Sequence, residues 1–96
     1  MATPEKLVKN KIKKILDKVG CYYFFPATGG YGKSGVPDII ICFKGHFVGI
    51  ECKTVGNKTT ALQELNLSQI RENGGDTLVV NEENLPDVEA WLVGTI

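Results

Sequence analysis

Three charged side chains stand at spacings that can bring them to one place. Asp38 begins an apolar run, and Glu51 and Lys53 stand two residues apart at the end of the next run. Alternate residues of a β-strand share a face, so Glu51 and Lys53 are expected to point together. Whether Asp38 joins them depends on the hairpin between the runs, because a shift of one residue sends a side chain to the other face.

The short turn between the two runs fixes that register. A two-residue loop at Gly45-His46 places Asp38 opposite Lys53. A four-residue loop over residues 44–47 gives the same pairing, and Glu51 then lies on the diagonal. A three-residue loop would send Asp38 to the other face of the sheet, away from Glu51 and Lys53. His46 itself is expected to be a turn residue, with a role as general base as the alternative.

Two carboxylates and an ammonium at one place suit the hydrolysis of a phosphodiester with a divalent cation. Carboxylate, carbonyl and water oxygens are the ligands that Mg²⁺ accepts, and Mn²⁺ accepts them as well. Such a cation polarises the phosphate and lowers the pKa of a bound water. The ammonium orients that water or offsets charge on the phosphate oxygens. We therefore predict Mg²⁺ or Mn²⁺ at Asp38 and Glu51.

The joint pattern resembles a known family. Gly35-Val36-Pro37-Asp38, then Glu51-Cys52-Lys53, then Gln63 resemble the motifs of the PD-(D/E)XK nuclease superfamily, and most closely its VRR-NUC branch. The resemblance extends from the helix with Glu5 to the strand after Gly75. A Glu-x-Lys motif alone is weak, because exposed strands often alternate charge, but the combination is much more specific.

The resemblance implies a role for each motif position. It implies that Asp38 and Glu51 bind the metal directly and that the backbone carbonyl of Cys52 is a further ligand. It also implies that Lys53 lies beside the attacking water and that Glu5 and Gln63 support the site. Two alternatives remain: an acid at a helix start is also favoured by the helix dipole, and a glutamine there can simply be a surface residue.

The resemblance also implies a substrate and an assembly. Family members act on branched DNA, including flaps and Holliday junctions, and the stand-alone viral and bacterial members act as homodimers. We therefore expect a metal-dependent DNA endonuclease. The alternative is a non-catalytic nucleic-acid-binding module on the same fold. The apolar segments 22–25 and 91–96 are candidate dimer surfaces, unless their aromatic side chains fill the core of a monomer.

Local signals predict an α/β fold with a restriction-endonuclease-like core, a mixed β-sheet flanked by helices in the order α-β-β-β-α-β-α. Thr3-Pro4 and Gly20 bound the first helix, and Thr60 can cap another. The expected ranges are a helix over 4–19, strands over 21–25, 38–43 and 47–53, a helix over 61–73, a strand over 77–80 and a helix over 86–93. The apolar residues expected to face the core include Leu7, Val8, Ile12, Leu16, Leu62, Leu65, Ile70, Val88, Trp91 and Leu92.

Composition is that of ordinary globular protein. The 96 residues are 43% hydrophobic and 23% charged, which suits a single domain over 1–96. No run approaches the roughly 20 apolar residues of a membrane span. We expect a soluble, intracellular protein, in a bacterial or phage-infected cell or a eukaryotic nucleus. Cys21, Cys42 and Cys52 are expected to be buried free thiols rather than zinc ligands or disulfides.

Charge is segregated along the sequence although the net charge is zero. Residues 1–58 carry a net charge of +6 and residues 59–96 a net charge of −6. If the segregation survives folding, a positive face can follow a phosphate backbone, with Lys9 and Lys13 as DNA contacts. The alternative is that these lysines form only the solvated side of an amphipathic helix.

The glycine-rich loop over residues 27–35 contains a segment, 27–34, that approximates a phosphate-binding Walker A motif with Ala in place of its first Gly. That motif needs a helix directly after it, whereas Pro37 disfavours a helical conformation at Val36. We therefore expect a loop that bends over the active site, where Tyr31 and Lys33 touch the nucleic acid. The alternative is a solvated loop.

Overall fold

The computed structural model describes residues 3–27 and 32–95, and the element order is the predicted one. The elements are α1 (Pro4–Val19), β1 (Tyr22–Phe24), β2 (Ile39–Phe43), β3 (His46–Cys52), α2 (Ala61–Glu72), β4 (Asp76–Val80), the 3-10 turn η1 (Leu85–Asp87) and α3 (Val88–Thr95). The predicted caps are present: Thr3 accepts a hydrogen bond from the amide of Lys6, and Gly20 ends α1 with a φ of 83°.

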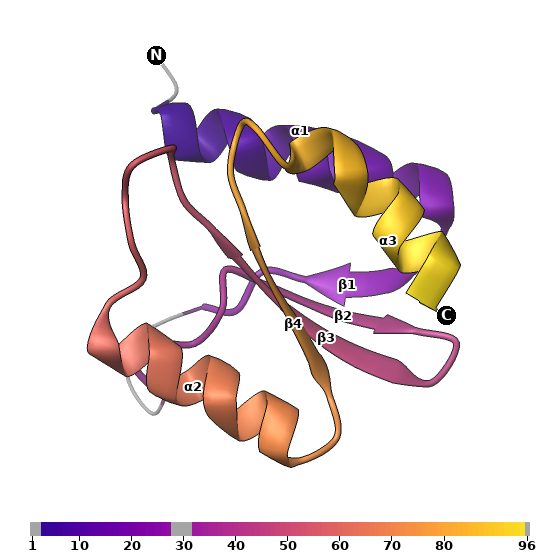
Figure 1. Ribbon diagram of the computed structural model, residues 1–96. Coiled ribbons are helices and arrows are strands. Elements are labelled where there is room, and N and C mark those ends of the chain that lie inside the picture. Colours follow the sequence, from indigo (N-terminus) through magenta and orange to yellow (C-terminus); the bar gives the residue numbers. More distant parts are fainter. Residues whose placement is uncertain (1–2, 28–31, 96) are drawn as a thin grey trace.

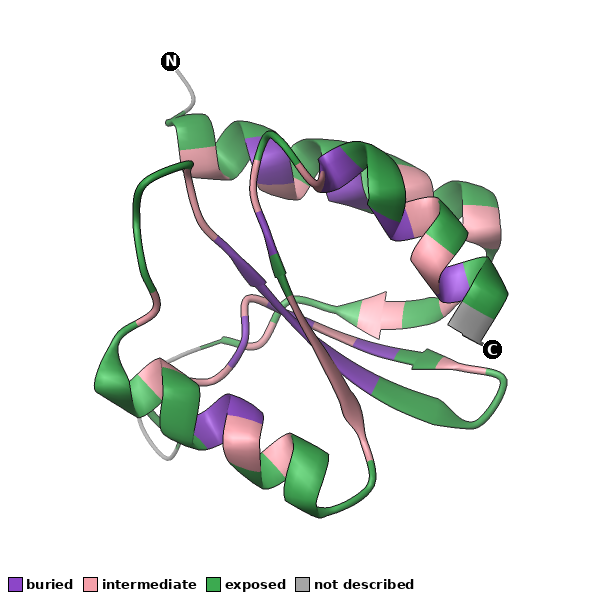
Figure 2. Cartoon of the chain, in the orientation of Figure 1, coloured by how far each residue is buried: buried purple, intermediate pink, exposed green. Residues whose placement is uncertain are grey.

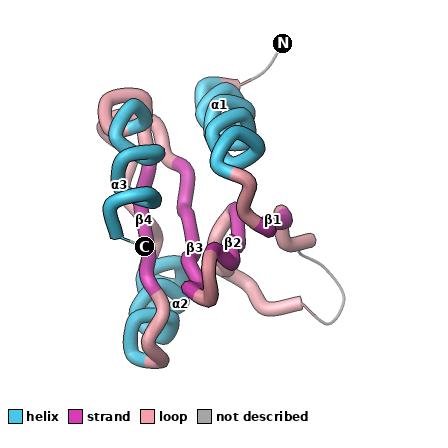
Figure 3. Tube along the Cα trace, turned by 90° about the vertical axis from the view of Figure 1, so that its right-hand side faces the viewer, coloured by secondary structure: helices cyan, strands magenta, loops and turns pink. Residues whose placement is uncertain are grey.

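The four strands form one mixed sheet in the order β1-β2-β3-β4. β1 and β2 are antiparallel, β2 and β3 are antiparallel, and β3 and β4 are parallel. The parallel pair is connected through α2, since a parallel connection requires a crossover. α1 and α3 lie on one face of the sheet, and α2 lies on the other (Figures 1 and 3).

The hairpin register differs from the prediction. Phe43 pairs with His46, so the two loop residues are Lys44 and Gly45, both with positive φ. Two positive φ values define the turn that best matches the twist of a hairpin. Continuing this register by one residue from Ile39 puts Asp38 opposite Glu51, not opposite Lys53. The shift is two residues, and side chains alternate between faces, so Asp38 still shares a face with Glu51 and Lys53.

Alternation along β3 divides its side chains between two layers. Val48, Ile50 and Cys52 are fully buried in the main core, which lies between the sheet and α1 with α3. Gly49 and Glu51 face α2, and a Cβ on Gly49 would meet the side chains of Ile70 and Pro37. The most buried segments converge on the middle of the sheet (Figure 2). Glu51 therefore lies in the layer between the sheet and α2.

Several side chains expected to be buried are exposed. Leu7 on α1 and Leu62 and Leu65 on α2 are 45 to 53% exposed. α2 instead buries Leu67 and Asn66, whose side-chain amide donates to the backbone carbonyls of Ser34 and Leu62. Of the three free cysteines, Cys42 is exposed because it lies on the less covered face of β2. The inward orientation predicted for Ile70, Val88, Trp91 and Leu92 is confirmed.

No helix in the described ranges is long and apolar enough to cross a membrane.

We predict that Gly35→Ala destabilises the fold far more than Gly56→Ala. Both glycines have positive φ, so both variants strain the backbone. Only at Gly35 would the new Cβ also lie 2.6 Å from Leu62 Cγ, whereas nothing lies within 4 Å at Gly56. The free energy of unfolding, measured by urea denaturation, should fall by about 2 kcal/mol more for Gly35→Ala, the usual cost of overpacking. Equal losses would contradict this packing.

Candidate metal centre

Three carboxyl groups from separate elements meet at one end of the sheet. Glu5 lies in the first turn of α1, Asp38 directly precedes β2, and Glu51 lies near the end of β3. One carboxylate oxygen of each lies within 4.8 Å of the others. The pairing of β2 with β3 sets the Asp38 and Glu51 positions, and the start of α1 brings Glu5 over the end of the sheet.

Asp38 is fixed by two donors. The backbone amide of Cys52 donates to its Oδ2 at 2.8 Å, and the Lys9 ammonium lies 3.1 Å from its Oδ1. Burial alone would raise the pKa of Asp38, but interactions with Glu51, the Cys52 amide and Lys9 together lower it. Asp38 is therefore the ionised member of the pair.

Glu51 is the protonated member. Its residue is only 2% exposed, and burial followed by the nearby Asp38 raises its pKa to about 8. Gln63 Nε2 donates to Glu51 Oε1 at 3.3 Å. Glu51 Oε2 is buried and receives no hydrogen bond from the described residues, whereas the protonated acid can donate to Asp38. A buried oxygen without a donor is costly in a folded protein, so the ionised form of Glu51 favours a cation as its partner.

Gln63 connects the start of α2 to the cluster. Its Oε1 accepts from the amide of Thr60 at 2.9 Å, and its own amide donates to Thr60 Oγ1, which completes a capping box. The free side-chain NH₂ is thereby turned toward Glu51. Gln63 is thus not a simple surface residue. The Thr-x-x-Gln spacing was the sequence signal for this geometry.

Lys53 and Cys52 extend from the same strand end. The Lys53 amide donates to the carbonyl of Val80 at 2.9 Å, which ties this end of β3 to β4. The positive charge of Lys53 acts against the upward shift of the Glu51 pKa. The Cys52 thiol points into the core, where burial raises its pKa to about 12. The thiol is therefore neutral.

The predicted DNA contacts have separate positions. Lys9 lies at the carboxylates, 3.9 Å from Glu5 and 3.1 Å from Asp38. The four-residue spacing of Glu5 and Lys9 in α1 was the sequence signal for the first contact, and sequence reasoning missed it. Lys13 is exposed and pairs with Asp17 at 3.7 Å. Lys33 donates to Gln69 on α2 at 3.4 Å. Tyr31 lies outside the described residues.

Two alternative readings of the sequence find no support in the geometry. His46 is exposed at the start of β3, at the opposite end of the strand from Glu51, and its Nδ1 lies 4.0 Å from Asp76. After the glycine-rich segment the described chain continues to β2, with no helix over residues 32–38. A phosphate-binding loop requires that helix.

The residues present fit a divalent metal ion. The donors are carboxylate oxygens, which hard cations prefer. One carboxylate oxygen each of Glu5, Asp38 and Glu51 lies within 4.8 Å of the other two, a spacing at which a single ion can contact all three. Lys9 already lies against two of these groups, which shows that the cluster attracts positive charge.

Comparison with solved structures finds a VRR_NUC domain with a similar fold. The match covers 99% of this chain and 100% of that chain, with a TM-score of 0.79 and 20% sequence identity. The chain therefore has the fold of a VRR_NUC domain, and the resemblance drawn from the sequence motifs is confirmed at the level of the fold. No family model matches the sequence, and no curated protein matches it.

We predict that the stability of the metal-free chain falls as the pH rises from about 4.5 to about 8, the ordinary and folded pKa values of Glu51. In this window the folded chain holds a proton that the unfolded chain has lost, so stability is fully present below it and declines through it. The loss is at most about 5 kcal/mol, at about 1.4 kcal/mol per pKa unit.

Glu51→Gln is the matched variant, because glutamine imitates the protonated acid. Urea denaturation with a chelator at pH 5 and pH 8 should show a smaller pH dependence for Glu51→Gln than for the parental chain. Parallel pH profiles for the two proteins would contradict a protonated Glu51.

Proposed function

We propose that this protein is a metal-dependent endonuclease that hydrolyses phosphodiester bonds in branched DNA. The observation that carries the proposal is the buried Glu51 oxygen without a hydrogen-bond donor, beside Asp38 and Glu5, in a chain with the fold of a VRR_NUC domain. A buried carboxyl group next to a second carboxyl group is poor for stability, which favours a functional reason for it.

Mg²⁺ or Mn²⁺ is the proposed cofactor, held by Asp38, Glu51 and the backbone carbonyl of Cys52, with Glu5 in support. When bound, the ion supplies Lewis-acid polarisation of the phosphate and a more acidic water. The chain supplies the rest. Gln63 orients Glu51 through its hydrogen bond, and the proposed role of the Lys53 ammonium is to orient the attacking water or to offset negative charge on the phosphate.

The proposed DNA-binding surface includes the outer side of α1. A hollow there is lined by three lysines together with Leu7, Asn10 and Asp17; the lysines are Lys11, Lys13 and Lys14. The charge segregation of the sequence is only partly retained, because the acidic C-terminal part packs beside α1 and Lys18 pairs with Glu89 at 3.1 Å. Lysines around the hollow still provide contacts to phosphates, which supply most non-specific affinity for DNA.

We further propose that two copies form a symmetric dimer, as paired incision of a Holliday junction requires two active sites. β1 is an edge strand of the sheet, and Tyr22, Phe24 and Phe25 are 41 to 71% exposed. These aromatic residues therefore do not fill the core of a monomer. An exposed, apolar sheet edge is a surface that proteins normally cover, and a two-fold axis covers it with a second copy.

A non-catalytic DNA-binding module is the second candidate. The exposed lysines of α1 favour it as much as they favour a nuclease. The buried Glu51 carboxyl group does not favour it, because phosphate binding requires no buried carboxyl group.

We predict that Asp38→Ala and Glu51→Ala abolish the cleavage of branched DNA and weaken metal binding. Lys53→Ala should lower the cleavage rate by about a hundredfold or more and leave metal binding intact, since it removes no ligand. Cleavage assays with Mg²⁺ and with a chelator, together with calorimetry of Mn²⁺ binding, separate these effects. Glu72→Ala, an exposed acid on α2, is the control. Parental activity in either carboxylate variant would refute the assignment.

We predict that light scattering at micromolar concentration gives twice the mass of one chain. Phe24→Lys places a charge on the exposed edge strand and should yield a monomer. Leu65→Lys alters a similarly exposed apolar residue on α2, 53% against 47% for Phe24, and should remain dimeric. A monomeric parental protein, with and without junction DNA, would refute the dimer.

A further inference from the structure

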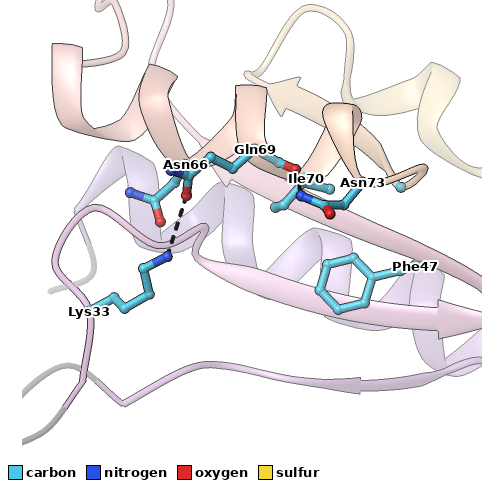
Figure 4. A pocket seen from close by; sticks show the side chains of 7 residues that line it. Lys33, Phe47, Asn66, Gln69, Ile70 and Asn73 are labelled. Atoms are coloured by element: carbon cyan, nitrogen blue, oxygen red, sulfur yellow. Dashed lines mark hydrogen bonds between the residues drawn. The ribbon is translucent and has the colours of Figure 1, made fainter.

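A cavity of about 490 Å³ lies between α2, the segment before β2 and the start of β3. Figure 4 shows Lys33 on one side, the Phe47 ring on another, and four side chains of α2 and its end above them. The labelled lining residues are Lys33, Phe47, Asn66, Gln69, Ile70 and Asn73. Its volume is in the range of small-ligand sites. The roles described above for the carboxylate cluster do not use this cavity.

The cavity and the carboxylate cluster share two elements. Phe47 and Glu51 lie on the same face of β3, about 13 Å apart at a rise of about 3.3 Å per strand residue. On α2, Gln63 at the cluster is followed at helical spacing by Asn66, Ile70 and Asn73 at the cavity. A DNA strand with its scissile phosphate at the cluster would reach the cavity within a few nucleotides, at about 3.4 Å per nucleotide.

The amide side chains of the cavity present both donors and acceptors. Asn66 and Asn73 use their NH₂ groups on backbone carbonyls of the described chain, which leaves their Oδ1 atoms as acceptors. Gln69 accepts from Lys33 through Oε1, which leaves its NH₂ as a donor. A nucleobase edge carries the same mixture of donors and acceptors.

The remaining lining suits a flat, uncharged ring next to a phosphate. Phe47 is 47% exposed, so the aromatic ring is available for stacking. Lys33 is the cation of the lining, and the described lining contains no acidic side chain. A simple anion would need no aromatic ring, and an apolar peptide would need no row of amides.

We propose that this cavity binds one unpaired nucleobase of the DNA substrate, stacked on Phe47, with amides of α2 at its edge and Lys33 near its phosphate. The proposal rests on the proposed function and deepens it. A base in a duplex has its pairing edge occupied, so the cavity would select DNA with an unpaired nucleotide near the cleaved bond. It would thereby contribute to the recognition of branches.

The test compares two DNAs of equal length, one fully paired and one with unpaired nucleotides at a branch. Binding is measured by fluorescence anisotropy with a chelator at one fixed salt concentration, because phosphate contacts depend strongly on salt. Phe47→Leu keeps apolar volume but removes the ring, and Phe47→Tyr keeps the ring. Leu65→Ala, an exposed apolar residue of α2 outside the cavity, is the control, and thermal melting checks folding.

Phe47→Leu should weaken the binding of the unpaired DNA by about tenfold, the usual effect of losing one stacked base. Its binding of the paired DNA should not change, and Phe47→Tyr and Leu65→Ala should bind both DNAs like the parental chain. A 2-aminopurine at the unpaired position should lose fluorescence on binding to the parental chain and not to Phe47→Leu.

Three results would overturn the proposal. Equal weakening for both DNAs would make Phe47 a general structural residue, and no weakening would leave the base elsewhere. In both cases the nuclease proposal stands if the parental chain still cleaves branched DNA. If the parental chain binds neither DNA, the proposed function fails and the cavity proposal fails with it.

Discussion

The two carboxyl groups of Asp38 and Glu51 lie side by side because the β2–β3 hairpin pairs their positions. Several neighbouring groups compensate for the electrostatic cost of this pair. A negative charge on the buried Glu51 beside a second one on the partly buried Asp38 is strongly unfavourable. In the metal-free chain the conflict is resolved by a proton on Glu51 and the ammonium of Lys9 beside Asp38. A divalent cation would resolve it more completely, since it offers positive charge to both groups.

The rest of the fold holds this end of the sheet together. The capping box that starts α2 also directs Gln63 to Glu51, so helix formation and site geometry depend on the same two residues. Gly35 lets the segment before Asp38 pass within contact of Leu62 on α2. The same approach of α2 to the sheet encloses the cavity at Phe47. Catalysis and base recognition are thus proposed for two places along one helix and one strand.

Features set by local chemistry could be predicted from the sequence, and features set by packing could not. The caps at Thr3, Gly20 and Thr60 depend on neighbouring residues alone. They set helix ends, so the order of helices and strands could be predicted. The predicted hairpin register was wrong by two residues because Lys44 has a positive φ of 50°, a conformation expected first of glycine. Because the shift is an even number of residues, Asp38 stays on the predicted face of the sheet. The exposure of Leu65 and the cavity at Phe47 depend on how α2 packs against the sheet. The apolar periodicity of the α2 sequence does not determine that packing.

The most direct measurement of the central claim is anomalous X-ray diffraction from crystals of the protein soaked in Mn²⁺. The ion should appear as one strong peak per chain between the carboxylates of Glu5, Asp38 and Glu51, with Lys9 displaced from Asp38. An Asp38→Ala crystal treated in the same way should lack the peak. A peak elsewhere, or none in the parental crystal with Lys9 still against Asp38, would contradict a metal centre at this site.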